Sequence, residues 1–145
     1  MIMEPVAIIA QQYPRVVIPL IEQAEESIRA VVFDWRVYPT QPGHAVTLFN
    51  QAIARAVKRG VDVRVLVAND GVAQQLRAHG LNVRRLHSKK LLHTKMIILD
   101  DTRVVIGSHN FTQSAFTLNE EASVLVEMPQ KDNSFAKYFD ALWGV

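Results

Sequence analysis

The sequence contains no cysteine. That absence excludes a disulfide framework, a thiolate nucleophile and any metal site built on cysteine ligands. Long apolar runs are also missing: the longest uncharged apolar stretches, residues 6–10 and 16–21, are far shorter than the roughly 20 residues of a membrane-spanning helix. The first residues carry Glu4 and no basic cluster, which is not typical of a signal peptide. The sequence therefore predicts a cytoplasmic protein without a transmembrane segment.

A large excess of charge of one sign is missing as well. The formal net charge is +2 at pH 7, although the sequence pI is about 9.1, so an anionic partner is compatible but not required. With 145 residues, 49% of them hydrophobic, the chain has the size and composition of a globular unit rather than of a disordered segment. We find no linker, low-complexity segment or internal repeat, and therefore predict a single domain over residues 1–145.

Hydrophobic periodicity predicts alternating strands and helices in the first half of the chain and mainly strands in the second. Expected strands cover residues 6–10, 30–37, 61–68, 82–86, 94–99, 103–106 and 122–127, and expected helices cover residues 14–27, 45–59, 72–79 and 134–143. A tight turn at residues 101–102 predicts a hairpin between two of the later strands. This order predicts an α/β fold, an α-β-α sandwich with a central mixed β-sheet.

Four polar residues of the second half fall at strand spacing. His93 and Lys95 are two residues apart, and so are Ser108 and Asn110. Side chains two residues apart on a strand share a face of the sheet. If the strands that carry the two pairs form a hairpin, the pairs lie side by side. One patch would then hold an imidazole, an ammonium, a hydroxyl and an amide.

Such a patch can perform phosphoryl chemistry without a metal or another cofactor. Lys95 and Asn110 can bind the non-bridging oxygens of a phosphate and stabilise the charge that builds up there. A neutral His93 can attack phosphorus and form a phosphohistidine, provided that its other ring nitrogen donates to an acceptor. Glu121 is the candidate acceptor, in the manner of the acid of a serine triad, with Glu120 as a competing neighbour.

Strand parity separates two further residues from this patch. Asp100 lies five residues after Lys95, so an unbroken strand would point it away from the patch. We expect it to act at the turn rather than directly in catalysis. His109 lies between Ser108 and Asn110, and the same alternation predicts that it packs in the core.

A basic cluster precedes the patch and consists of Arg84, Arg85, Lys89 and Lys90. A run of charges is most often solvated surface. The alternative is a basic rim that binds a polyanionic substrate and guides it toward His93. We treat the four residues as candidate substrate-binding residues.

The spacing of the patch residues resembles the signature of the phospholipase D superfamily, H-x-K-(x)4-D-(x)6-G-S-x-N. The matching positions are His93, Lys95, Asp100, Gly107, Ser108 and Asn110, followed downstream by Asn119 and Glu121. A chance match to six or seven fixed positions is expected in about one in a million such chains, or fewer. The chain has one copy of the motif, and the order of strands and helices before the motif also fits this superfamily.

The resemblance implies a metal-independent phosphodiesterase with two histidines in its active site, one as nucleophile and one to protonate the leaving oxygen. With a single motif, the chain resembles short bacterial endonucleases and the mitochondrial cardiolipin-hydrolase type, in which two subunits share one site across a two-fold axis. This implies a homodimer with His93 and Lys95 of both subunits in one site. Asp100, Ser108, Asn110 and Glu121 are the further catalytic-site residues that the resemblance implies.

Three functions compete on this basis. The basic pI and the basic cluster at residues 84–90 favour a nuclease that hydrolyses DNA or RNA. A phospholipid phosphodiesterase acting on a cardiolipin-type lipid would need a membrane-docking segment, and no such segment stands out. The third alternative is a nucleic-acid-binding domain that keeps the fold without activity, and the intact motif argues against it.

Overall fold

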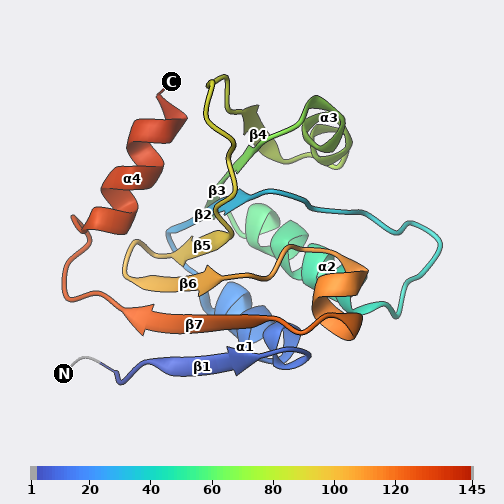
Figure 1. Cartoon of the computed structure of the whole chain (residues 1–145), viewed down its shortest axis with the longest axis horizontal. Helices are drawn as coiled ribbons and strands as arrows, with labels where there is room; N and C mark the ends of the chain where they lie inside the picture. Colours follow the sequence, from blue (N-terminus) through green and yellow to red (C-terminus); the bar gives the residue numbers. More distant parts are fainter. Residues whose placement is uncertain (1–2, 145) are drawn as a thin grey trace.

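The structure, a computed structural model, describes residues 3–144 (Figure 1). Its strands are β1 (Val6–Ile9), β2 (Ser27–Val32), β3 (Asp62–Val67), β4 (Asn82–Arg85), β5 (Met96–Leu99), β6 (Arg103–Gly107) and β7 (Ala122–Glu127). Its helices are α1 (Gln12–Gln23), α2 (Ala45–Lys58), α3 (Asp70–Ala78) and α4 (Ser134–Trp143), and a π-helical turn spans Ser114–Leu118.

The seven strands form one mixed sheet in the order β1-β7-β6-β5-β2-β3-β4. β2, β3 and β4 are parallel, because α2 and α3 carry the chain back before each following strand. β5, β6, β7 and β1 pair antiparallel with their neighbours, and a short turn at residues 100–102 joins β5 to β6. The predicted α/β fold with a mixed sheet is therefore confirmed.

Helices cover both faces of the sheet and give it three layers (Figure 1). α1, α2 and α3 pack on one face, over a core cluster that includes Ile28, Phe49 and Val65. α4 packs on the other face, where Phe139 and Trp143 are buried. None of the helices within residues 3–144 combines the length and the apolar run that a bilayer crossing requires.

The boundary between α1 and β2 differs from the prediction. The helix ends at Gln23 rather than at residue 27, and β2 covers residues 27–32 rather than 30–37. The cause is distant in sequence: the Asp100 carboxylate accepts hydrogen bonds from the backbone N–H groups of Glu25, Glu26 and Ser27. β2 therefore starts earlier than its hydrophobic pattern indicates. β3 pairs with it from Ser27 and β5 from Ile28.

Strand ends from both halves of the chain converge at one end of the sheet. Val31 near the end of β2 pairs with Met96, the first residue of β5. Met96 also pairs with Ile106 near the end of β6, and Gly107 pairs with Ser123 at the start of β7. The segments that carry the sequence motif leave or enter the sheet at this end, which places their polar side chains together.

Candidate active site

His93 and Lys95 lie in the extended segment just before β5, not on the strand as predicted. The Lys95 carbonyl accepts a backbone hydrogen bond from Gly107 (3.2 Å), which holds the pair beside the end of β6. Lys95 Nζ lies 3.3 Å from Nδ1 and 3.2 Å from Nε2 of the exposed His93, and donates to its carbonyl at 3.1 Å. The ammonium therefore lies almost equally far from both ring nitrogens and places a positive charge against the exposed imidazole.

Ser108 and Glu121 form the second polar pair, at the junction of β6 and β7. Ser108 Oγ donates to Glu121 Oε1 at 2.5 Å and accepts from the Ala122 N–H at 3.0 Å. The other carboxylate oxygen, Oε2, accepts from Asn119 Nδ2 at 3.0 Å. Gly107 makes this junction possible, because a Cβ at that position would overlap the backbone of Ala122 and Ser123.

The two pairs belong to one electrostatic cluster. Partial burial lowers the pKa of Lys95, and the nearby negative charge of Glu121 opposes this effect. The Phe33 ring, just after β2, supports both members of the first pair: its centroid lies 5.5 Å from that of His93 and 5.9 Å from Lys95 Nζ. Desolvation strengthens the field of Lys95 at the position where a phosphate would bind.

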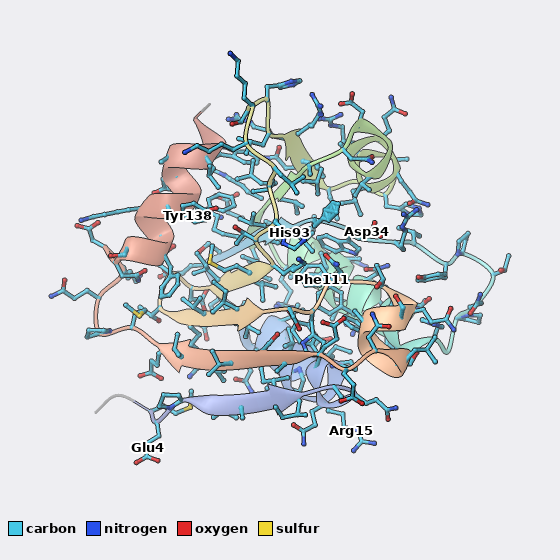
Figure 2. All side chains as sticks on the ribbon, viewed as in Figure 1. Glu4, Arg15, Asp34, His93, Phe111 and Tyr138 are labelled. Carbon is cyan, nitrogen blue, oxygen red and sulfur yellow. The ribbon has the colours of Figure 1, made fainter. Side chains whose placement is uncertain are left out.

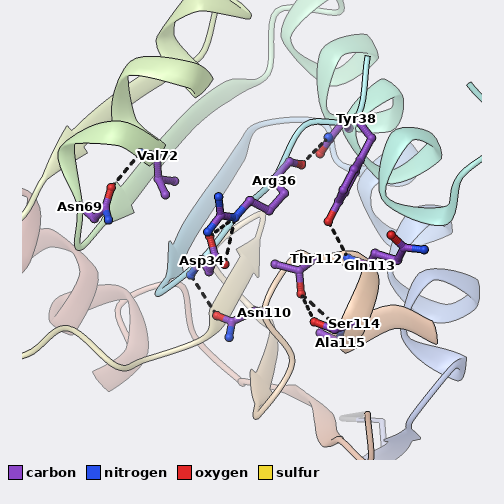
Figure 3. A network of polar contacts seen from close by, with 11 residues as sticks. Asp34, Arg36, Tyr38, Asn69, Val72, Asn110, Thr112, Gln113, Ser114 and Ala115 are labelled. Carbon is purple, nitrogen blue, oxygen red and sulfur yellow. Dashed lines mark hydrogen bonds and ion pairs between the residues drawn. The ribbon is translucent and has the colours of Figure 1, made fainter. Parts of the chain in front are cut away.

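Asn110 reaches the same end of the sheet through a backbone contact. Its Oδ1 accepts from the Asp34 N–H at 3.0 Å (Figure 3). The amide nitrogen takes no part in this hydrogen bond and can donate to a substrate. Figure 2 shows His93, Asp34 and Phe111 gathered at this end of the sheet. The predicted cluster of imidazole, ammonium, hydroxyl and amide groups is therefore assembled, and it has the donors that a phosphate needs.

The Glu121 carboxylate accepts hydrogen bonds from two side chains. Within residues 3–144 the carboxylate bonds to Ser108 and Asn119, and no hydrogen bond joins it to His93. Glu121 as the group that orients His93 therefore stays a prediction, because the contacts of the carboxylate within one chain are to Ser108 and Asn119. Glu121 fixes Ser108 and supplies the negative charge that acts on Lys95.

His109 packs in the core, as strand alternation predicts. It is 1% exposed, its Nε2 donates to the Ala10 carbonyl at 2.8 Å, and Ser123 Oγ lies 2.7 Å from its Nδ1. The Tyr13 ring lies against it, with centroids 4.5 Å apart. Burial lowers the pKa of His109, against the opposing effects of the Ala10 hydrogen bond and the Glu121 charge.

Asp100 lies at the opposite end of β5 from His93 and is not part of the cluster. It has a positive φ of 52° at the β5–β6 turn, a conformation that Asp adopts more readily than most residues. Partial burial alone would raise the pKa of Asp100, but hydrogen bonds from the Glu26, Ser27 and Glu25 N–H groups hold it below its usual value. The resemblance places Asp100 among the catalytic-site residues, and the structure corrects this. Strand alternation predicts that Asp100 acts at the turn, and the structure shows it there.

The basic cluster divides into Arg84, which packs against α4, and three residues around a cavity: Arg85 at the end of β4, and Lys89 and Lys90 after it. Arg84 donates to the Trp143 carbonyl at 2.6 Å and its guanidinium lies 4.0 Å from the Trp143 ring centroid, so it attaches β4 to α4 instead of facing a substrate. Arg85, Lys89 and Lys90 line a cavity of about 300 Å³ that Leu92, the neighbour of His93, also lines. Those three residues remain candidates for binding substrate.

Metal ligands are not gathered at the cluster. Residues 3–144 contain no group of three or more histidine, aspartate or glutamate side chains that could hold a metal ion. The group that contacts the His93 ring is the Lys95 ammonium, which carries a positive charge and is not a metal ligand in that form. The chemistry that the cluster can perform itself is nucleophilic attack by an imidazole on a phosphate held by ammonium and amide donors.

Comparisons with known proteins agree with this geometry. The family model described as "Cardiolipin synthase, PLD-like domain" matches residues 17–143. The chain belongs to the phospholipase D superfamily. This is a superfamily of phosphodiesterase hydrolases, and the match spans both the strand order and the single motif. The sequence prediction of the family is confirmed.

The phospholipase D relatives of this chain include curated proteins similar in sequence and a solved structure similar in fold. A mitochondrial cardiolipin hydrolase from Xenopus laevis is 33% identical over 67% of this chain, and a phospholipase D from Rickettsia prowazekii is 32% identical over 77% of it. The chain covers 51% and 53% of these two proteins, so it spans about half the length of the curated relatives it matches. Nuc from Salmonella typhimurium, a solved phospholipase D family member, has a TM-score of 0.75 and 26% identity over 97% of this chain and 95% of its own.

Sequence reasoning missed the residues after β2 that complete this phospholipase D site. Phe33 supports His93 and Lys95, and the Asp34 N–H fixes Asn110. Both lie about sixty or more residues from the motif, so no local spacing could reveal them. The expectation that a strand continued to residue 37 concealed them, because it treated these residues as part of the sheet.

Proposed function

We propose that the chain is a metal-independent phosphodiesterase that hydrolyses nucleic acid through a phosphohistidine on His93, at a site shared by two copies of the chain. The observation that carries the proposal is an exposed imidazole with a lysine ammonium 3.2 Å from a ring nitrogen, beside a hydroxyl and an amide. This arrangement supplies a nucleophile and phosphate-binding donors without another group.

The reaction proceeds in two displacements. A ring nitrogen of His93 attacks phosphorus, the P–N bond forms, and the P–O bond to the leaving group breaks. The leaving oxygen takes a proton from a second imidazole, which then removes a proton from water. That water attacks phosphorus, breaks the P–N bond and restores His93, while Lys95 and Asn110 hold the non-bridging oxygens throughout.

The second imidazole is the reason for proposing a homodimer. Within residues 3–144 the histidines other than His93 all lie outside the cluster: His109 is buried, His87 contacts Arg85, His44 caps α2 and His79 caps α3. A base and an acid are both needed, and each chain supplies one imidazole. An isologous two-fold contact over the motif brings His93 of the partner subunit to the same phosphate.

Two features favour a nucleic acid as the substrate. The likeness to Nuc extends over nearly the whole of both chains, whereas the relatives named for lipid substrates are matched over about half their length. Arg85, Lys89 and Lys90 also surround a cavity that adjoins the His93 segment, which suits the repeated negative charges of a polynucleotide.

A phospholipid is the second candidate, and one observation favours it besides the names of the curated relatives. Leu91 is 70% exposed and Leu118 is 75% exposed, each only a few residues from a member of the site. Apolar side chains at such positions can contact acyl chains.

The test compares single- and double-stranded DNA, single- and double-stranded RNA, and cardiolipin vesicles as substrates in excess EDTA. We expect cleavage of at least one nucleic acid without added metal, and no release of phosphatidic acid from the vesicles. Hydrolysis of the vesicles alone would replace the nuclease by the lipid phosphodiesterase. A folded dimer that cleaves none of the five would support the alternative of a silent nucleic-acid-binding domain.

A further inference from the structure

The segment that follows β2 is attached to the irregular segment after β6 that carries Asn110. Phe111 N–H donates to the Asp34 carbonyl and Arg36 N–H donates to the Phe111 carbonyl, both at 3.0 Å, and Trp35 forms a parallel bridge with Phe111. Together with the bond from Asp34 N–H to Asn110, these contacts fix the backbone of residues 34–36 relative to the site. A side chain on this segment therefore has a defined position relative to Asn110.

Arg36 is such a side chain, and Asp34 determines its direction. Arg36 Nε donates to Asp34 Oδ2 at 3.1 Å and lies 2.9 Å from Oδ1, so the guanidinium folds back toward the Asn110 side of the segment (Figure 3). Its carbonyl accepts from Asn50 Nδ2 at 3.1 Å, which holds the backbone from the other side. Within the described part of the chain, the two terminal amino groups of Arg36 have no hydrogen-bond partner.

The ion pair between Arg36 and Asp34 contributes little to the stability of the fold. The Arg36 side chain is 57% exposed, and an exposed ion pair stabilises a protein by only about 0–1 kcal/mol. Its geometry suits recognition instead. Nε is engaged by Asp34, whereas the two amino groups are left for a ligand, and two such groups can bind a phosphate in a bidentate manner.

We infer that Arg36, held by Asp34, binds the phosphate next to the scissile one and thereby favours substrates with several phosphodiesters in series. The inference rests on the proposed function and adds a residue to it. The cluster of His93, Lys95 and Asn110 is sufficient for one phosphate, whereas a polynucleotide presents another on each side. Arg36 is a binding residue outside the reacting atoms, so it acts on the affinity for the polymer.

The test uses a single-stranded oligonucleotide and bis(p-nitrophenyl) phosphate, which has only one phosphodiester. Arg36→Gln should raise KM for the oligonucleotide about tenfold and leave kcat/KM for the small diester unchanged within about twofold. The slope of log KM against log salt should fall in magnitude by about 0.7, as expected for the loss of one contact to a single-stranded phosphate.

Two further variants serve as controls. Arg15→Gln removes an exposed arginine of α1 that Figure 2 shows far from His93, and it should change neither substrate's kinetics. Asp34→Asn releases the Arg36 side chain, so it should raise the oligonucleotide KM by less than Arg36→Gln does. The double variant should be no worse than Arg36→Gln alone, because Asp34 acts through Arg36.

The outcomes separate this inference from the proposed function. An unchanged oligonucleotide KM in Arg36→Gln overturns the inference while the wild-type enzyme still hydrolyses both substrates. An equal loss on both substrates also overturns it, since that result assigns Arg36 a role at the scissile phosphate or in the fold. A wild-type protein that hydrolyses neither substrate overturns the proposed function, and the inference with it.

Discussion

Replacing His93 by alanine should reduce kcat for nucleic acid cleavage by about 10⁴-fold or more, because the variant loses the nucleophile of the proposed reaction. His93 is exposed, and its side chain contacts Lys95 and Phe33 without being buried by them. Truncation therefore removes chemistry with little cost to folding. Initial rates in excess EDTA, with thermal unfolding measured in parallel, give the comparison.

Mixed dimers test the shared site in the same variant. A dimer of one wild-type and one His93→Ala subunit should have far less than half of the wild-type activity, because the remaining imidazole cannot be both nucleophile and acid. Half activity would show that each chain works alone and would contradict the dimeric site. His79→Ala, which removes an exposed histidine after α3, is the matched control and should retain full activity.

Replacing Lys95 by methionine should reduce kcat by about 10²–10³-fold, the usual effect of losing one donor that stabilises charge in the transition state. Methionine keeps an unbranched stem against the Phe33 ring, so the loss reports the charge rather than the packing. Lys58→Met removes an exposed lysine at the end of α2 and should leave the rate unchanged. Full activity in Lys95→Met would exclude Lys95 from phosphate binding.

The pH dependence gives the same residue a second readout. Activity needs the ammonium form of Lys95, so the rate should fall as the pH rises through the pKa of Lys95. Burial lowers this pKa and the charge of Glu121 raises it. Glu121→Gln keeps an acceptor for Ser108 and removes the charge, so it should move the alkaline limb to lower pH. A limb that stays in place would show that another group limits the rate.

The order of strands and helices could be predicted from the sequence because each element has a local pattern. The βα units before the motif and the hairpin within it were sufficient to predict the mixed sheet. The start of β2 could not be predicted, because Asp100 holds it from a turn more than seventy residues away. The π-helical turn Ser114–Leu118 also lacks a periodic signal, since five residues are too few to show one.

The sequence was enough to predict which motif residues lie together in the site, but not which hydrogen bonds they form. Period-two spacing was enough to bring His93, Lys95, Ser108 and Asn110 to one end of the sheet, although the first two precede β5 rather than lie on it. Spacing gives no information about which donor a carboxylate accepts from, and Glu121 accepts from Ser108. Spacing also groups adjacent residues that face apart, as Arg84 and Arg85 do.

The central claim is that His93 forms a covalent bond to phosphorus, and the configuration of the phosphorus in the product tests it most directly. The substrate is an oligonucleotide with one phosphorothioate link of known configuration, cleaved in water enriched in heavy oxygen with excess EDTA. Each in-line displacement inverts phosphorus, so attack by His93 followed by attack of water predicts overall retention. Inversion would show that water attacks the substrate directly and would contradict the phosphohistidine.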